Sequence, residues 1–158
     1  MASSCGKEQQ MNRDFDQCIN SKKIVAFTRG KTLVKKELAI AQSDLSDARA
    51  GFNNQRHKWS TVQAYYAMFH AARALIYSRG YREKSHHCLA VALRKLFVEE
   101  GLIEAQAVRD FLNAMNLREA ADYEAEFSQS GAEAVIASAE RFIEKTMAIL
   151  NAAGQDTE

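Results

Sequence analysis

Proline is absent from this 158-residue chain, and glycine occurs only seven times. Without these residues little interrupts a helix, and little supplies the turns that many short strands need. The 47% of hydrophobic and 26% of charged residues are globular values, and a chain of this length buries a real core. These absences predict one all-α domain.

Long apolar runs are also missing, and the N-terminus MASSCGKEQQ lacks the apolar stretch of a secretory signal. We therefore expect a cytoplasmic protein without a membrane segment. Cysteine is scarce: Cys5, Cys18 and Cys88 form no C-x-x-C pair and have no histidines at zinc-finger spacing. This odd count predicts neither a disulfide framework nor a structural zinc site, and we expect no metal and no cofactor.

Acidic residues are few in the first part of the chain, and basic residues are few in the last. Residues 1–97 carry 17 Lys and Arg against 7 Asp and Glu, whereas residues 98–158 carry 4 against 13. Antiparallel helices of opposite charge that pack side by side would explain this gradient. A basic face for phosphates is the alternative. The first is favoured, because no run of Lys and Arg is long enough to act alone.

The spacing of apolar residues predicts five helices. Val34, Leu38, Ala41, Leu45, Ala48 and Phe52 recur at steps of four and three, which is typical of a helix from about Lys31 to Asn53. A second helix is predicted from Val62 to a stop at Gly80, and a third from an N-cap at Ser85 to Gly101. A fourth is predicted from Val108 to about Phe127, and a fifth from a capping box at Ser130 and Glu133 to Leu150. Short loops between them favour an antiparallel up-and-down bundle of four to five helices.

The ends of the chain look different from its middle. Residues 1–11 are polar and predict a flexible tail, residues 12–29 predict a short N-terminal helical flap, and residues 153–158 predict a second tail. The bundle domain is therefore expected at 12–152.

Polar residues follow one stripe of the second predicted helix. Tyr66, His70, Arg73 and Tyr77 lie at i, i+4, i+7 and i+11, so they share a face. At the edge of a core such residues can keep their polar tips in water without any ligand. Their alignment makes a supporting part of a site about equally plausible.

The turn before Ser85 is rich in groups that bind anions. It holds Arg79, Arg82, Lys84, His86 and His87, next to the free amides of a helix N-terminus. These residues predict a phosphate or nucleotide site, although an exposed polar loop would look the same. The two adjacent histidines point about 100° apart on a helix, so they cannot share a metal ion.

The last polar group is Arg118 with Asp122 and Tyr123. Arg118 and Asp122 have the spacing of an intrahelical ion pair, worth a few tenths of a kcal/mol when exposed. Alternatively, Arg118 is a phosphate clamp and Tyr123 is a hydrogen-bond donor or stacking surface.

Four stretches resemble the HEPN-domain family, in its branch of small bacterial and archaeal proteins. They are DFDQCIN, ELAIAQSDLSDA, KWSTVQAYYAMFHAARALIYSRGYREKSHHCLAVAL and LREAADYEAEFS, and the resemblance covers about Asp14 to Leu150. It implies a bundle of four or five helices, commonly a homodimer, and frequent pairing with a minimal nucleotidyltransferase in toxin–antitoxin modules. Catalytic relatives are metal-independent ribonucleases, whose motif is Arg, four to six residues and then His, assembled across the dimer interface.

This chain departs from that motif. Arg118 matches the arginine, but the fifth residue after it is Tyr123, and no histidine follows His87. We therefore expect a nucleotide- or RNA-phosphate-binding partner module of toxin–antitoxin type. The alternative is a metal-independent RNA endonuclease toxin, in which Arg118 and Tyr123 act with a substitute acid or base, and His86, His87 and His70 are the candidates for it.

Overall fold

The structure, a computed structural model, describes residues 4–155. In this range the chain forms six α-helices, one π-helical turn and two three-residue strands. In chain order they are α1 (Ser4–Asn20), β1 (Ile24–Ala26), α2 (Gly30–Asn53), α3 (His57–Ser78), β2 (Tyr81–Glu83), α4 (His86–Leu93), η1 (Arg94–Val98), α5 (Ala105–Tyr123) and α6 (Gln129–Gln155).

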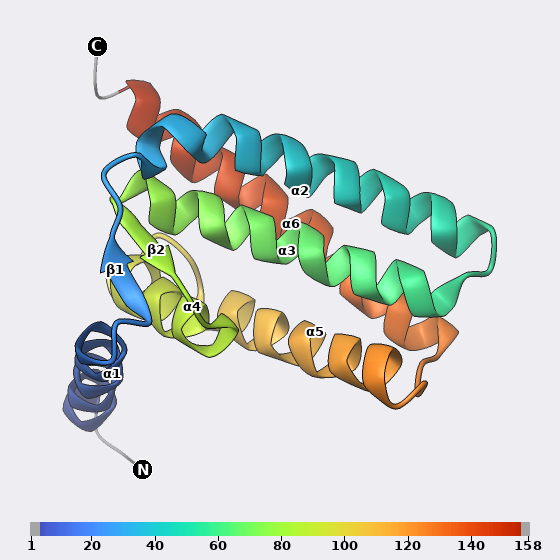
Figure 1. The fold of residues 1–158 in the computed structure, drawn as a ribbon, viewed down its shortest axis with the longest axis horizontal. Coiled ribbons are helices and arrows are strands. Elements are labelled where there is room, and N and C mark those ends of the chain that lie inside the picture. Colours follow the sequence, from blue (N-terminus) through green and yellow to red (C-terminus); the bar gives the residue numbers. More distant parts are fainter. Residues whose placement is uncertain (1–3, 156–158) are drawn as a thin grey trace.

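Four long helices, α2, α3, α5 and α6, form the bundle, and successive ones alternate in direction (Figure 1). α2, α5 and α6 all lie against α3. The predicted helical bundle is therefore confirmed, with six α-helices among the described residues, while the small two-strand hairpin was not predicted. α2 begins and ends within one residue of the predicted range. None of the described helices combines the length and the apolar character that a membrane crossing requires.

The central helix is α3, which contacts all three other long helices. It is buried almost along its whole length because the sequence AMFHAARALIY places small alanines between large apolar side chains. Small side chains let a neighbouring helix approach closely. α2 comes close to α3 at Gly30, where an added Cβ would lie 2.8 Å from the carbonyl oxygen of Tyr77.

The N-terminal region differs from the prediction. α1 is a helix of 17 residues that starts at Ser4, inside the stretch expected to be a tail, and α6 continues to Gln155, inside the other expected tail. Residues 1–3 and 156–158 of those tails lie outside the described residues. β1 pairs antiparallel with β2, with Ile24 opposite Glu83 and Ala26 opposite Tyr81. The domain boundaries at 12 and 152 stay a prediction.

A disulfide joins α1 to α4, which corrects the expectation drawn from the cysteine count. Cys18 and Cys88 are bonded with their Cα atoms 5.9 Å apart, although 70 residues separate them in the sequence. Both are buried, whereas Cys5 is free and exposed. Sequence spacing carried no signal here, because the fold brings the two residues together.

The predicted helix ends are mostly right. The Ser85 hydroxyl caps α4 by accepting from the amide of Cys88, and Gly80 and Gly101 have φ of 80° and 75°, in the left-handed region that glycine favours. The capping box at Ser130 and Glu133 was wrong. Ser128 caps α6 instead, because its Oγ accepts from the amide of Gly131 at 2.9 Å.

Candidate phosphate site at Arg118

Arg118 occupies the inner face of α5 and is only 7% exposed. Its guanidinium lies over three tyrosine rings. The carbon at its centre is 5.2 Å from the ring centroid of Tyr65, 5.4 Å from that of Tyr66 and 5.9 Å from that of Tyr123. Ring faces carry negative electrostatic potential, so the three tyrosines hold the cation in place without neutralising it.

The charge of Arg118 has little compensation from acids. The predicted intrahelical partner, Asp122, is present, but its carboxylate oxygen is 3.9 Å from Nη1. The Nε of Arg118 is buried without a hydrogen-bond partner. By contrast, Arg73 lies 2.6 Å from Glu83, and Arg79 lies 2.9 Å from Glu100. An incompletely paired buried cation is costly, and an incoming anion would complete its hydrogen bonds.

His86 is the histidine that the fold brings to Arg118. Its Nδ1 is hydrogen-bonded to the hydroxyl of Tyr65, the same tyrosine whose ring lies under Arg118. The imidazole also stacks on Phe69 with ring centroids 4.6 Å apart. Burial, and then the charges of Arg118 and Arg73, lower the pKa of His86. His86 is therefore a neutral imidazole at physiological pH.

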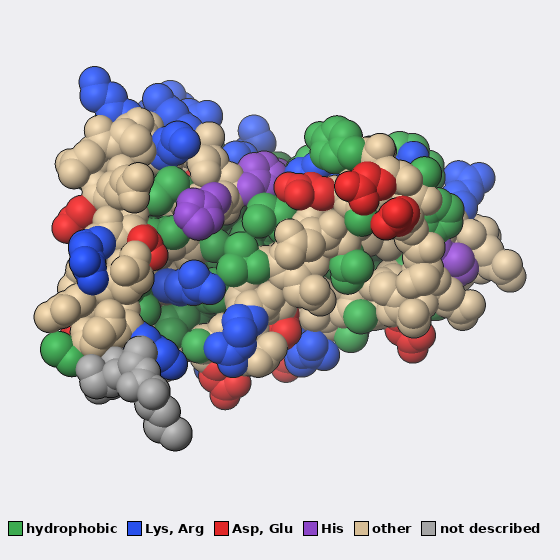
Figure 2. All heavy atoms as spheres, turned by 90° about the horizontal axis from the view of Figure 1, so that it is seen from below, with side chains coloured by type: hydrophobic (Ala, Val, Ile, Leu, Met, Phe, Trp, Pro, Cys, Tyr) green, Lys and Arg blue, Asp and Glu red, His purple; other side chains and the backbone are tan. Residues whose placement is uncertain are grey.

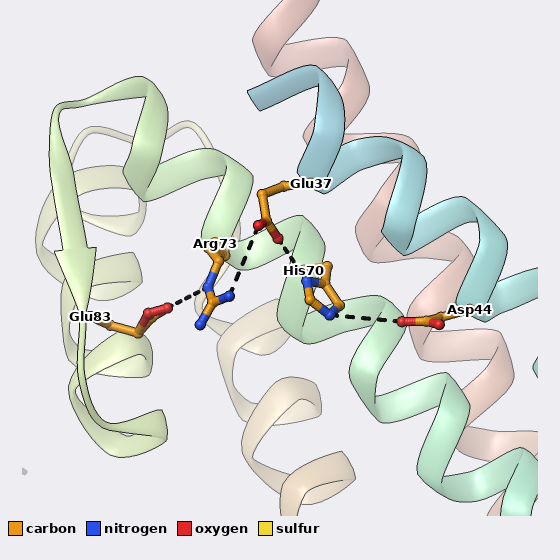
Figure 3. Close-up of polar contacts among 5 residues, drawn as sticks. All are labelled: Glu37, Asp44, His70, Arg73 and Glu83. Atoms are coloured by element: carbon orange, nitrogen blue, oxygen red, sulfur yellow. Dashed lines mark hydrogen bonds and ion pairs between the residues drawn. The ribbon is translucent and has the colours of Figure 1, made fainter. Parts of the chain in front are cut away.

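Two residues of the polar stripe of α3, His70 and Arg73, have acidic partners (Figure 3). His70 Nδ1 is 2.6 Å from Glu37 on α2, and its Nε2 is 3.9 Å from Asp44. Arg73 donates from Nε to Glu83 on β2 at 2.6 Å. The stripe thus fastens α3 to α2 and to the small sheet, and it does not bring His70 to Arg118.

Sequence reasoning missed the three carboxylates and Tyr65. Glu37 lies on the apolar seam of α2 and is buried, so a charged residue at a core position was the available signal. Asp44 and Glu83 offered no such signal. Burial raises the pKa of Glu83 even though Arg73 acts in the opposite direction.

The residues of the turn before α4 have different surroundings. Arg79 pairs with Glu100, and Arg82 lies over the ring of Phe27, 5.5 Å from its centroid. Lys84 and His87 are exposed. His87 lies beside the disulfide, at a hollow of about 130 Å³ that Lys23 also lines. The structure therefore brings His86 to Arg118 and directs Arg79 and His87 elsewhere.

Figure 2 shows histidine side chains near the middle of one face, between Lys and Arg side chains at the upper left and Asp and Glu side chains to their right. A larger hollow of about 560 Å³ lies elsewhere, between α5 and α6, and Met68, Ile103 and Phe142 contribute to its lining. No residue of the predicted site lines it.

Across residues 4–155 no group of three or more His, Cys, Asp or Glu side chains is placed to hold a metal ion.

The lowered pKa of His86 predicts a pH dependence of stability. Its ordinary value is 6.5, so below that pH the unfolded chain takes up a proton more readily than the folded chain does. We expect the wild type to lose unfolding free energy between pH 7 and 5.5 relative to His86→Phe, which keeps a ring on Phe69. Urea unfolding across this range measures the difference.

His87→Phe is the matched control for this experiment, because it removes an exposed imidazole from the same turn. Arg118, Arg73 and Glu119 act on the pKa of His86 and are present in both chains being compared. Equal pH slopes for the wild type and His86→Phe would contradict the prediction.

Comparison with known proteins identifies the family of the chain. The sequence model of the HEPN domain matches residues 34–150. A protein of Methanocaldococcus jannaschii named "Putative toxin" is 34% identical over 109 residues, which are 68% of this chain and 81% of that protein. A UPF0332 protein of Archaeoglobus fulgidus is 30% identical over 119 residues, 73% of this chain and 94% of the relative.

A third relative, a UPF0332 protein of Pyrococcus horikoshii, is 35% identical over 71 residues, which are 45% of this chain and 50% of that protein. The domain match spans most of the chain and includes Arg118, His86 and the tyrosines around them. The resemblance drawn from the sequence is confirmed, and the chain belongs to the HEPN domain family.

Proposed function

We propose that this HEPN protein is a nucleotide- or RNA-phosphate-binding module of toxin–antitoxin type, with Arg118 as the phosphate clamp. The observation that carries the proposal is the buried Arg118 guanidinium, which rests on three tyrosines and, within residues 4–155, has no carboxylate closer than 3.9 Å. A planar guanidinium binds two phosphate oxygens at once. The names of two relatives, "Putative toxin", support the toxin–antitoxin context.

Tyr123 would bind the base of the same ligand. Its side chain is 76% exposed and lies next to Arg118. Stacking of a base on an aromatic ring contributes about 1–3 kcal/mol and tolerates any base. A nucleotide carries both a phosphate for Arg118 and a base for Tyr123, so nucleotides or single-stranded RNA fit the site better than inorganic anions do.

Binding is favoured over cleavage by the residue at position 123. Metal-independent cleavage needs a group that transfers protons near neutral pH, which an imidazole does well and a phenol with a pKa of about 10 does poorly. Here a tyrosine occupies the place that the family's nuclease motif gives to histidine.

The alternative, a metal-independent RNA endonuclease toxin, also has a specific observation in its favour. His86 and Arg118 both contact Tyr65, so an imidazole lies close to the clamp although it comes from another helix. In this version His86 would replace the missing acid or base, and Arg118 would stabilise the charge on the phosphate.

Arg118→Ala is expected to weaken binding of a labelled single-stranded RNA by about 10- to 100-fold, the loss of charge-assisted hydrogen bonds worth about 1.5–3 kcal/mol. Fluorescence anisotropy at two salt concentrations measures this loss, and the salt slope should fall by about one. Arg109→Ala is the matched control, because Arg109 is an exposed arginine of the same helix.

Equal affinity of Arg118→Ala and wild type would contradict the proposal. The same RNA, run on a denaturing gel after incubation with a chelator, separates the two functions. Intact RNA supports binding alone. Cleavage by the wild type that disappears in both Arg118→Ala and His86→Phe would instead establish the endonuclease.

A homodimer and a nucleotidyltransferase partner stay part of the proposal. Three large aromatic side chains are exposed, Trp59, Tyr123 and Phe127. They come from the start of α3, the end of α5 and the loop after it. Exposed aromatic residues of this kind are enriched where proteins meet partners.

A further inference from the structure

Tyr65 connects Arg118 and His86, the two functional groups of the candidate site. Its side chain is fully buried, with an exposed fraction of 0%. Its ring lies 5.2 Å below the centre of the Arg118 guanidinium, and its hydroxyl is hydrogen-bonded to Nδ1 of His86. The rings of Tyr65 and His86 are nearly parallel, with an interplanar angle of 15°. One buried residue therefore contacts both functional side chains.

The direction of the Tyr65–His86 hydrogen bond follows from burial. A buried hydroxyl hydrogen needs an acceptor, because leaving it unpaired costs about 1–3 kcal/mol. The nearby Arg118 has only donors to offer. Among the described residues, His86 Nδ1 is the acceptor that the Tyr65 hydroxyl reaches. Tyr65 therefore donates, and Nδ1 accepts.

The tautomer of His86 follows from that direction. A neutral imidazole has one protonated and one unprotonated nitrogen, so an accepting Nδ1 places the proton on Nε2. His86 is only half-buried, and its Nε2 is not among the buried polar atoms without partners. Nε2–H is thus free to donate to a ligand. Burial raises the pKa of Tyr65 and lowers that of His86, which keeps both groups in these neutral forms.

We propose that Tyr65 is the positioning residue that fixes His86 as an Nε2–H donor, so that His86 and Arg118 together bind the oxygens of one phosphate. This inference rests on the proposed function. It specifies the ligand as a deprotonated phosphate group, whose oxygens accept hydrogen bonds. In this tautomer His86 has no free lone pair to act as a base. Its role is to hold the phosphate, not to remove a proton from a nucleophile.

Long-range proton–nitrogen NMR of the full chain at pH 7.5 tests the tautomer directly. The His86 signals are identified by their loss in His86→Phe. The wild type is expected to show a protonated Nε2 and an unprotonated Nδ1, and Tyr65→Phe should shift both nitrogens towards the average of two exchanging tautomers. Tyr66→Phe is the matched control for this measurement. Tyr66 also lies under Arg118, but among the described residues it is the hydroxyl of Tyr65, not that of Tyr66, that is hydrogen-bonded to His86. A protonated Nδ1 in the wild type overturns the inference.

Binding of the labelled RNA provides the second readout. Tyr65→Phe keeps the ring under Arg118 and removes one oxygen, so we expect about three- to tenfold weaker binding. Tyr81→Phe, which removes a hydroxyl on β2 outside the site, should bind like the wild type. Unchanged affinity in Tyr65→Phe overturns the positioning role. If the wild type binds no RNA, the proposed function and the ligand class fail, whereas the NMR result still decides whether Tyr65 sets the tautomer.

Discussion

Reduction of the Cys18–Cys88 disulfide is expected to lower the free energy of unfolding by about 4 kcal/mol, because the bond closes a loop of 70 residues in the unfolded chain. The bond also fastens α1, whose first half is exposed, to α4. Removal of the bond should therefore release α1 before the bundle unfolds.

Urea unfolding with and without a thiol reductant measures the first effect, and hydrogen exchange of α1 amides measures the second. Cys5→Ser is the matched control, because it removes the free cysteine and leaves the disulfide intact. Cys18→Ser should behave like the reduced wild type and should not respond to reductant. The same urea midpoint in both conditions would show that the bond does not contribute.

Arg73→Leu is expected to destabilise the fold by about 3 kcal/mol, the lower end of the cost of breaking a buried ion pair. Arg73 lies 2.6 Å from Glu83, whose side chain is only 2% exposed. The other carboxylate oxygen of Glu83 is already buried without a partner. Without Arg73, the buried Glu83 carboxylate would lose its nearest cationic partner.

Two further variants isolate the cause of that loss. Arg79→Leu removes an arginine whose partner, Glu100, is 52% exposed, and such a pair contributes at most about 1 kcal/mol. The double variant Arg73→Leu with Glu83→Leu should recover much of the lost stability, since replacing both members of a buried pair with apolar residues is often neutral. A double variant as unstable as the single one would show that Arg73 acts through packing on Phe69 rather than through Glu83.

The long helices were predictable because their apolar residues repeat with the helical period. α2 lies within one residue of its predicted range, and the stops at Gly80 and Gly101 follow from a left-handed conformation that glycine adopts easily. α1 was predicted only in part, as a short helical flap within 12–29, because residues 4–10 are mostly polar and carry no apolar stripe. The two strands were missed because three residues are too few to show an alternating pattern and their pairing spans distant segments.

The site was predictable in its types of residue but not in its pairs. Arg118, Tyr123 and His86 stood out as chemical groups, whereas Tyr65 resembled an ordinary core residue beside the more conspicuous Tyr66. Which histidine reaches Arg118 depends on how α4 packs on α3. The sequence shows His86, His87 and His70 with equal weight, and only the fold assigns His70 to Glu37 and His86 to Tyr65.

The contact between Gly30 and Tyr77 helps to fix the position of α2 along the axis of α3. Seven residues along α2 from Gly30 lies Glu37, and seven residues back along α3 from Tyr77 lies its partner His70. Both steps are about two helical turns, so the two contacts belong to a single alignment of the helix pair. With any larger residue at position 30 the helices would have to separate or shift. The absence of a side chain at position 30 thus permits the alignment that places His70 beside Glu37 and Asp44.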